Sequence, residues 1–361
     1  MKLTKKILAA TVAGIIAAVP AIAQDLRVAP AAPPAHPAHY MYEKLSEYLA
    51  SDAEMGTTIL GPEVVALPQI ADALNTGLVD VGNALPLYFA ADFPTTGIAG
   101  DLALEGRDPH AMGLAMTEWV LNCPACLEEF SEFGGVFLGS GSTDVYGLIT
   151  TTPVNSPDDL RGLRLRTGGA PFTRFAEHFG ATGVQMAVGD TFEALSQGTI
   201  DGTVTSLVDM LSYRLVDVAT HYNTLPVGTY HALSNFTVAS PTWERMSVEE
   251  RTALARAANR ANFDLTDRWA FQLPAAAREA VDASDIVVTE PSAELIAATE
   301  AFAKMDSAAQ IEKSGEFASD FLALVDAWAL AVEGIDNDTE ALAALAWDRI
   351  WSKLDFSTYG L

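Results

Sequence analysis

The segment Pro157–Val204 constrains the fold of this chain most, because strand-like and helix-like hydrophobic periods alternate along it. Leucine and arginine alternate at 163–166, as in a short strand, and a Gly-Gly pair ends the run by admitting unusual backbone angles. The pattern then predicts a helix at 171–179, a strand at 184–186, a helix at 191–197 capped by Asp190, and a strand at 199–204. This β-α-β-α-β order favours parallel strands.

A second copy of this pattern lies nearer the N-terminus. The stretch Ala73–Gly82 matches Ala194–Thr203 at an alanine, a leucine, a glycine and an aspartate. Helix-glycine-strand junctions also recur by chance in α/β proteins, but the flanking order supports a repeat, with a strand at 26–29, a helix at 37–51 and a strand at 57–60. We therefore expect two α/β lobes of similar design, with ligands gathered at the C-terminal ends of the strands.

The N-terminus has the pattern of a secretory signal peptide at residues 1–23. Three lysines at positions 2, 5 and 6 precede an apolar run at 7–23 that ends in Ala-Ile-Ala. An uncleaved signal anchor is the rival interpretation, but Pro20 and the small residues before Gln24 favour cleavage. No later segment is long and apolar enough to span a bilayer, so we expect an exported chain without membrane insertion.

The charge of the chain excludes several classes of partner. Loss of the signal peptide removes three positive charges and no negative one, which changes the formal charge from −26 to −29. Such an excess opposes binding to nucleic acid or to anionic lipid. An anionic ligand would need a local positive site, and because salt screens distant charges over roughly 8–10 Å, one buried arginine is sufficient.

The chain resembles a known family at the same segment. The run D-D-L-R-G-L-R-L-R-T-G-G at 158–169, with F-G-A-T-G-V-Q-M-A and D-T-F-E-A-L-S-Q-G-T-I-D-G after it, resembles the extracytoplasmic solute-binding proteins of TRAP transporters, the DctP family. The likeness extends to the stretches at 26–30, 60–63 and 240–251. It implies a periplasmic protein that captures a small organic acid and delivers it to the small and large membrane subunits of a permease.

The resemblance also implies an architecture. The expected fold is α/β, a two-lobed periplasmic-binding-protein fold with mixed, mainly parallel sheets, a long helix spanning both lobes and a helical C-terminal region. We expect residues 24–145 plus about 237–265 in the first lobe. Residues 146–236 plus about 266–361 would form the second lobe and the bracing helices, with crossovers near Tyr146 and Phe236.

Arg166 is the principal candidate for ligand binding. A guanidinium presents a planar fork of donors that matches a carboxylate, and it stays charged at any relevant pH. In the family this position carries the arginine that clamps the ligand carboxylate, and Gly168 follows it at the end of the strand. A structural ion pair or a surface position suits Arg161 and Arg164 better.

Two departures from the family pattern narrow the range of ligands that we expect. Tyr146 stands where many dicarboxylate binders have a second arginine, and Thr205 ends a Thr-Val-Thr run where the family often has Gln-Glu-Asn. Thr205 can still donate one hydrogen bond, but a C4-dicarboxylate is in doubt. A monocarboxylate with an apolar or aromatic part fits Tyr146, Leu85 and Tyr88 better.

Five further polar residues are weaker candidates. Asp209 would meet a ligand cation, although a solvated position on a helix face is commoner, and Glu63 would accept from a ligand hydroxyl or amine unless it is merely solvated. His231 and Asn235 lie near the second crossover, at ligand or hinge. We expect His36 to line the cleft, because its proline-broken loop lacks the further ligands a metal needs, and we expect no cofactor.

The pair Cys123 and Cys126 forms a C-P-A-C motif, which we expect to be a disulfide in an oxidising compartment. The motif also defines the rival function, a thiol-disulfide oxidoreductase. In such enzymes the motif follows a strand and opens a helix, whereas here we expect it to end the helix at 111–121. No catalytic triad or nucleotide loop is visible, so we expect a binding protein rather than an enzyme. A binding protein that serves a sensor or an ATP-driven importer is the other alternative.

Overall fold

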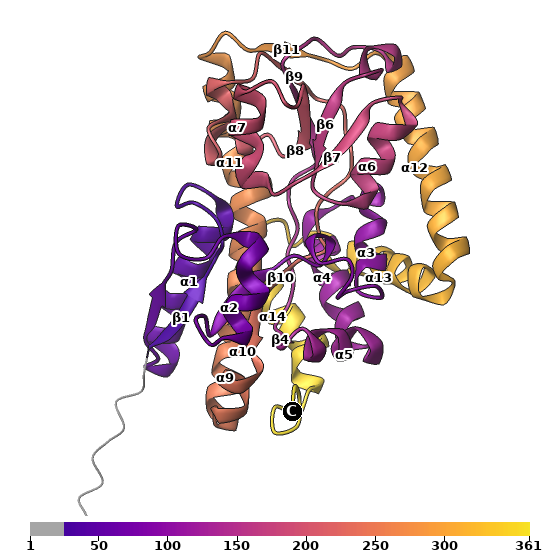
Figure 1. Cartoon of the computed structure of the whole chain (residues 1–361). Helices are drawn as coiled ribbons and strands as arrows, with labels where there is room; N and C mark the ends of the chain where they lie inside the picture. The colour runs from indigo at the N-terminus through magenta and orange to yellow at the C-terminus, as the bar shows by residue number, and fades with distance from the viewer. Residues whose placement is uncertain (1–24) are drawn as a thin grey trace, which may run out of the picture.

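The computed structural model describes residues 25–361 as two β-sheets with helices packed around them (Figure 1). The expected signal peptide, residues 1–23, lies outside the described residues. The two sheets lie one above the other, and five of the nine strand pairings are parallel. The expected two-lobed α/β fold with mixed sheets is confirmed.

The first sheet has five strands in the order β2-β1-β3-β10-β4. Its strands are β1 (Leu26–Ala29), β2 (Thr57–Ile59), β3 (Val81–Ala84), β4 (Gly135–Phe137) and β10 (Ser234–Ala239). β1 pairs in parallel with β2 and β3, while β10 is antiparallel to both of its neighbours. All residues of β3, β4 and β10 are buried, as expected for strands covered on both faces.

The second sheet has six strands in the order β11-β9-β5-β8-β6-β7. They are β5 (Gly147–Thr150), β6 (Arg164–Thr167), β7 (Thr182–Gln185), β8 (Gly202–Thr205), β9 (His221–Asn223) and β11 (Val287–Thr289). β6 pairs in parallel with β7 and β8, which confirms the prediction from 157–204.

The chain passes between the sheets several times. It leaves the first sheet after β4, forms β5 to β9, and returns to add β10. Tyr146 lies directly before β5, and Phe236 lies within β10. Each sheet therefore contains a strand contributed from a later part of the chain.

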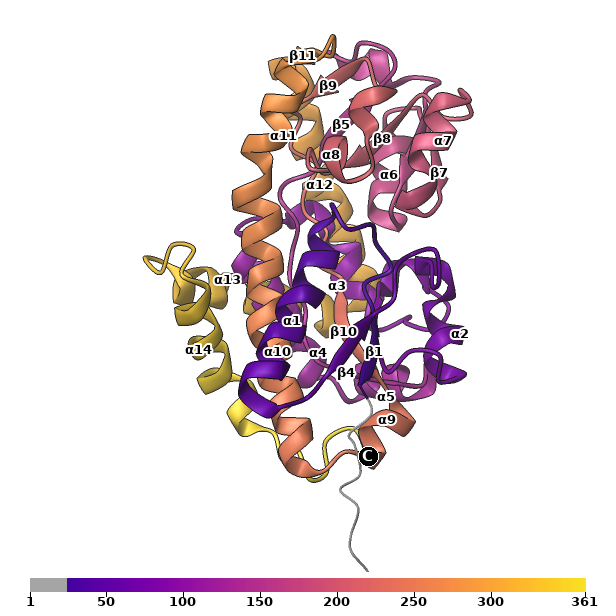
Figure 2. The same cartoon turned by 90° about the vertical axis from the view of Figure 1, so that its left-hand side faces the viewer.

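The helices cover the sheets and join them. They are α1 (Pro37–Ala53), α2 (Ile70–Asn75), α3 (Gly97–Asp101), α4 (Pro109–Leu121), α5 (Pro124–Glu132), α6 (Ala170–His178), α7 (Thr191–Ser196), α8 (Asp209–Ser212), α9 (Ser240–Arg245), α10 (Val248–Asp267), α11 (Leu273–Asp282), α12 (Ala293–Ser314), α13 (Glu316–Val332) and α14 (Thr339–Arg349). A π-helical turn, Arg268–Gln272, joins α10 to α11. Figure 2 shows the resulting long helix running from the lower sheet to the upper one, with α1 packed along its lower half.

The C-terminal helices return to the lower half of the molecule. α12 descends beside both halves, α13 packs on α4, and α14 packs on α10. Of the segments beyond residue 266, α11 packs on α8 and β11 joins the second sheet. The expected lobe boundaries concern which parts move together, and they stay a prediction.

Three local expectations were wrong or had a different cause. Asp190 makes no side-chain cap to α7. The C-P-A-C motif does not simply end α4, because Cys123 is the N-cap of α5. Neither Gly168 nor Gly169 has a left-handed backbone, since the φ of 163° at Gly169 is extended. Space is the constraint instead, because a Cβ at Gly169 would lie 2.9 Å from Leu87 Cδ1.

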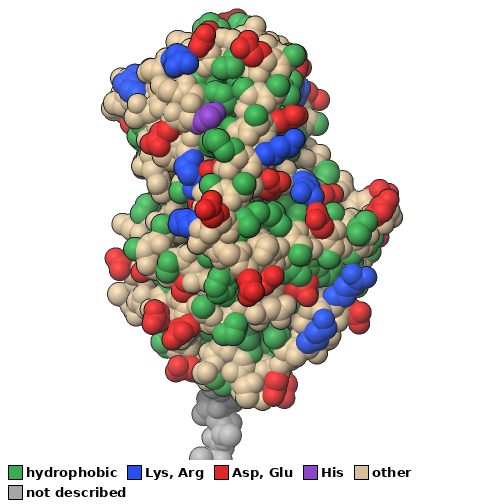
Figure 3. Space-filling view, turned by 90° about the vertical axis from the view of Figure 1, so that its right-hand side faces the viewer, with side chains coloured by type: hydrophobic (Ala, Val, Ile, Leu, Met, Phe, Trp, Pro, Cys, Tyr) green, Lys and Arg blue, Asp and Glu red, His purple; other side chains and the backbone are tan. Residues whose placement is uncertain are grey.

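The surface carries the acidic excess that the composition implies. On the face seen in Figure 3, acidic side chains are spread over the narrow upper part and the broader lower part, with basic side chains among them. Among the described helices, none combines the length and the hydropathy required to cross a bilayer.

Candidate ligand-binding site

A cavity lies where the carboxyl ends of β1 and β3 meet those of β6 and β8. Residues from both sheets and from the long helix line it: Ala31, Ala32, His36, Ala38, Leu67, Asn83, Leu85, Tyr88, Tyr146, Arg166, Gly168, Val188, Asp209, Tyr213, Tyr230, Leu233, Asn235, Leu265 and Trp269. Its volume is about 50 Å³. One ordered water needs roughly 10–15 Å³ of such space, so the cavity holds only a small molecule.

Arg166 is held inside this cavity by its strand and by two neighbours. Its side chain is buried, with only 2% of the residue exposed. Nε and Nη2 each donate to the Met186 carbonyl over 3.1 Å, and Nη2 also donates to the Tyr88 hydroxyl. Among the described residues no carboxylate forms an ion pair with Arg166, whereas Arg164 on the same strand pairs with Asp201. Nη1 takes part in none of these bonds and is free to bind a ligand.

Aromatic rings surround the guanidinium end of the cavity. Tyr146 stacks on Phe172 with a centroid distance of 5.2 Å, and Tyr230 lies beyond them. The Tyr230 hydroxyl is buried without a hydrogen-bond partner in the described structure. Burial also raises the pKa of Tyr146 and Tyr230, so both hydroxyls stay protonated. These phenols are donors for an anion placed on Arg166.

His36 contributes a neutral imidazole. It caps α1, and its Nδ1 accepts from the Ala38 amide over 3.0 Å, which places the proton on Nε2. Its ring packs edge-on against Trp269 and beside Tyr213, with centroid distances of 4.6 and 5.3 Å. Burial, with a smaller contribution from His39, lowers the pKa of His36 to about 3. The His36 ring is therefore uncharged at neutral pH and is a donor through Nε2.

Asp209 is the one acid of the cavity lining. It is 2% exposed, its Oδ2 accepts from the Thr205 hydroxyl, and its Oδ1 has no partner among the described groups. Burial raises the pKa of Asp209 to about 6, while the Thr205 bond and the charge of Arg166 oppose that rise. The expectation of a solvated helix-face aspartate is therefore wrong.

Two amides line the opposite, first-sheet side. Asn83 donates through Nδ2 to the Pro30 carbonyl over 3.2 Å, and this bond leaves its Oδ1 buried and unpartnered within the described chain. Asn235 donates to Asn262 Oδ1 over 2.6 Å. Asn235 therefore links the cavity wall to α10.

Three predicted site residues are not in the lining. Thr205 is not in the lining, and its hydroxyl donates a hydrogen bond to the Asp209 carboxylate. Glu63 is exposed in its loop. His231 is buried outside the cavity, where Nε2 bonds the Ala99 carbonyl and the ring stacks on Phe321. The cavity does include the predicted residues His36, Leu85, Tyr88, Tyr146, Arg166, Gly168, Asp209 and Asn235.

Several lining residues were not among the predicted site residues, above all Asn83, Tyr213, Tyr230 and Trp269. Trp269 reaches the cavity from the π-helical turn, and its Nε1 donates to Ser206 over 3.1 Å. Asn83 lies at the carboxyl end of β3, where the expected location of ligands would have pointed to it. Tyr213, Tyr230 and Trp269 carry no local signal, because an aromatic residue in a helix or a loop is usually interpreted from sequence as part of the hydrophobic core.

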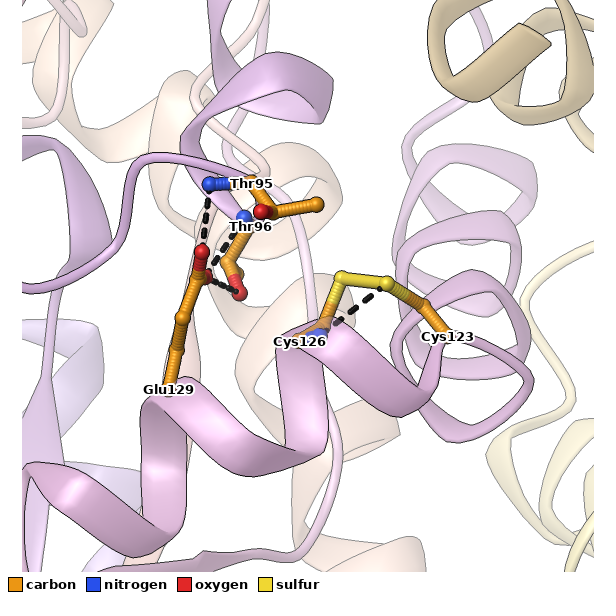
Figure 4. Close-up of a disulfide and its surroundings, with 5 residues drawn as sticks. All are labelled: Thr95, Thr96, Cys123, Cys126 and Glu129. Carbon is orange, nitrogen blue, oxygen red and sulfur yellow. Dashed lines mark hydrogen bonds between the residues drawn. A yellow bond between two sulfur atoms is a disulfide. The ribbon is translucent and has the colours of Figure 1, made fainter.

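The C-P-A-C motif is remote from the cavity lining. Figure 4 shows Cys123 and Cys126 joined at the start of α5, with Glu129 farther along the helix. The Glu129 carboxylate accepts from the amides of Thr95 and Thr96, directly before α3. Both cysteines are at most 5% exposed, so an attacking thiolate lacks access to their sulfurs.

Two solute-binding proteins are similar in sequence to part of this chain. A solute-binding protein of Chromohalobacter salexigens is 28% identical over 150 residues, which are 41% of this chain and 43% of that protein. A solute-binding protein of Roseobacter denitrificans is 31% identical over 114 residues, 31% of this chain and 34% of the relative. The aligned stretch thus spans less than half the length of these relatives.

Solved structures share the fold over most of the chain. A marine metagenome TRAP solute-binding protein in complex with 3-hydroxybenzoate has a TM-score of 0.75 at 20% identity, covering 84% of this chain and 98% of that one. A TRAP solute-binding protein from Rhodoferax ferrireducens, with copurified benzoate, has a TM-score of 0.77 at 17% identity, covering 86% and 99%. The family model of bacterial extracellular solute-binding protein, family 7, matches residues 65–313, more than half of the chain, and the chain therefore belongs to this family.

Proposed function

We propose that this chain is the periplasmic binding protein of a TRAP-type transporter and that it holds a small organic acid by its carboxylate on Arg166. One observation carries the proposal: a buried arginine without an acidic partner in the described chain faces an aromatic-lined cavity between the two sheets. A buried charge is stabilised by a paired, hydrogen-bonded counter-charge. The ligand carboxylate supplies that charge, with Tyr88 as a neighbouring donor.

The size and lining of the cavity favour a small acid with an apolar part. The walls are mainly aromatic and aliphatic, and the volume is about 50 Å³. Tyr146 occupies a position where a second arginine would favour a dicarboxylate, and its ring is stacked rather than charged. Two solved relatives that share this fold hold aromatic monocarboxylates, 3-hydroxybenzoate and benzoate.

Capture would proceed by closure of the two halves of the molecule, each built on one sheet, over the ligand. Arg166, Tyr146 and Asp209 come from the second half, while His36, Leu85 and Tyr88 come from the first. The bond from Arg166 to Tyr88 crosses between the halves and fastens the closed form. The closed surface is then what the small and large permease subunits recognise.

Calorimetric titration of the purified protein and of Arg166→Ala tests this proposal. A thermal-shift panel of benzoate, mandelate, glucuronate, succinate and pyroglutamate first selects a ligand. A charge-assisted hydrogen bond contributes roughly 1.5–3 kcal/mol, so loss of Arg166 weakens binding by about tenfold to a hundredfold. Arg164→Ala, on the same strand but paired with Asp201, is the matched control and keeps its affinity. Equal affinity in the wild type and in Arg166→Ala would contradict the assignment.

The alternative functions have direct tests of their own. A binding protein for a sensor or an ATP-driven importer would capture the same acid but deliver it to a different partner. Co-purification with a histidine kinase or an ATPase, instead of the permease subunits, would favour that alternative. Strong turnover in an insulin-reduction assay would favour the oxidoreductase. The burial of Cys123 and Cys126 opposes that outcome.

A further inference from the structure

The cavity contains more unpartnered acceptors than a simple carboxylate ligand can use. Asp209 Oδ1 and Asn83 Oδ1 are both buried and without a hydrogen-bond partner in the described structure. Asp209 is 2% exposed and Asn83 is 6% exposed, and both residues line the cavity. Leaving a buried acceptor unpaired costs roughly 1–3 kcal/mol, so each calls for a donor on the ligand.

The two acceptors are positioned independently. Asp209 begins α8 in the second half, and its other oxygen is held by Thr205. Asn83 belongs to β3 in the first half, and its amide nitrogen is held by the Pro30 carbonyl, which fixes the direction of its oxygen. A carboxylate has no proton to give either oxygen. The ligand must therefore carry N–H or O–H donors in addition to its carboxylate.

The charges of the lining distinguish between these donors. Arg166 is the one cation of the lining and Asp209 the one acid, while His36 is a neutral donor. With Asp209 ionised, a monoanionic ligand would leave this small cavity with a net negative charge, which is costly to bury. A zwitterion leaves it neutral and brings at least two N–H donors. Aromatic faces of Tyr213 and Trp269 beside His36 suit a cationic group as well.

We propose that the physiological ligand is a small amino-acid-like zwitterion, with its carboxylate on Arg166 and its cationic N–H group on Asp209 and Asn83. This inference rests on the proposed carboxylate site and specifies its ligand class. In it, Arg166 anchors every carboxylate, and Asp209 selects those that also carry a positive nitrogen. The carboxylate end would be completed by the hydroxyls of Tyr88 and Tyr230, which are donors close to Arg166.

Matched ligand series test the selection directly by calorimetry on the purified protein. The first series is proline, tetrahydrofuran-2-carboxylate and cyclopentanecarboxylate, which share one ring shape and differ only in N–H, ether oxygen or methylene. The second series is alanine, lactate and propionate. The third series is phenylglycine, mandelate and phenylacetate. We expect the amino member of at least one series to bind at least tenfold tighter than both of its analogues. The inference is overturned if no amino member exceeds its analogues.

Asp209→Asn separates the role of the acid from a structural one. The variant keeps the size of the side chain and the contact with Thr205, and Asp217→Asn, an exposed aspartate eight residues later, is the control. We expect the amino member to lose at least tenfold in affinity while the corresponding acid without the amine is unchanged or gains. An equal loss for both, or no loss for either, contradicts the inference. If acids bind through Arg166 but amino members do not, the zwitterion fails and the carboxylate site stands; if Arg166→Ala changes nothing, the carboxylate site itself fails.

Discussion

The two repeated halves share a structural ion pair and differ at the residue two positions farther along the strand. In the first sheet Arg27 on β1 donates its amide and Nε to Asp80 Oδ2, each over 2.9 Å. In the second sheet Arg164 on β6 donates the same two groups to Asp201 Oδ2 over 2.8 and 2.9 Å. Both aspartates immediately precede the third strand of the repeat, and the strand orders β2-β1-β3 and β7-β6-β8 match.

The difference between the halves lies at the carboxyl end of the first strand. Two residues after Arg27 stands Ala29, whereas two residues after Arg164 stands Arg166. The repeated arginine therefore locks the strand to its neighbour, and the added arginine serves the cavity. The second half supplies the charged groups of the site, while the first supplies Asn83, His36, Leu85 and Tyr88. The two halves thus share a framework, and the cavity is lined by residues that are present in only one half or the other.

The largest expected effect concerns the ion pair in the first half. The Asp80 side chain is 4% exposed and accepts from Arg27, Arg245 and Thr242. Burial alone raises the pKa of Asp80, but these hydrogen bonds outweigh burial and lower it to about 2. We expect Asp80→Asn to lower the free energy of unfolding by about 3 kcal/mol, because it removes the charge from a buried network.

Its counterpart Asp201→Asn should cost only about 1 kcal/mol, since that pair is partly solvated. A lowered carboxyl pKa stabilises the fold above the unfolded pKa of about 3.9 and loses that contribution as the pH falls through about 2. Acid titrations of unfolding in the wild type and both variants check this. Equal losses in the two variants would show that the pairs are equivalent.

A second prediction concerns the disulfide between Cys123 and Cys126. These are the two cysteines of the chain, so the second half has no counterpart of this bond. Closure of a four-residue loop contributes about 2 kcal/mol on the entropic model. Cys123→Ser with Cys126→Ser should lower the melting temperature accordingly and leave ligand affinity intact. Differential scanning calorimetry with and without a reductant measures the first effect and titration the second. A loss of affinity would instead connect α5 to the cavity.

The smallest expected effect is a gain in stability from Asp209→Asn. Arg166 is the charged group that acts on Asp209, and its charge opposes the rise of the Asp209 pKa. Asp144 also lies near Asp209, but burial raises its own pKa to about 8, so it is protonated where Asp209 titrates, and the phenols of Tyr146 and Tyr213 are neutral. The raised pKa of about 6 means that the ionised form is disfavoured in the fold, so wild-type stability falls as the pH rises through that value.

The Asn variant lacks this charge and should therefore be about 1–2 kcal/mol more stable at pH 8. At pH 4 the two proteins should differ little. Chemical denaturation at both pH values measures the difference. An unchanged difference between pH 4 and pH 8 would show that Asp209 does not ionise in this range.

Much of the framework could be read from local pattern. Alternation at 163–166, the phenylalanines of 171–179 and the glycine stops predicted β6, α6 and their parallel partners, because these signals depend on a few neighbouring residues. The position of Arg166 at a strand end was read in the same way. The end of α4 at Leu121, just before the cysteine pair, was also predicted. The new helix that begins there was not, although Pro124 suits the first turn of a helix.

The sequence by itself determined the repeated β-α-β-α-β order, the buried strands and the arginine at the end of β6, because hydrophobic period and turn residues act over short distances. Only the tertiary structure decided that Asn83, Asp209 and Trp269 face the same cavity, and that Glu63, Thr205 and His231 do not. Those residues lie on segments far apart in the chain. Their meeting depends on how the crossovers turn two sets of strand ends toward each other, which no local pattern encodes.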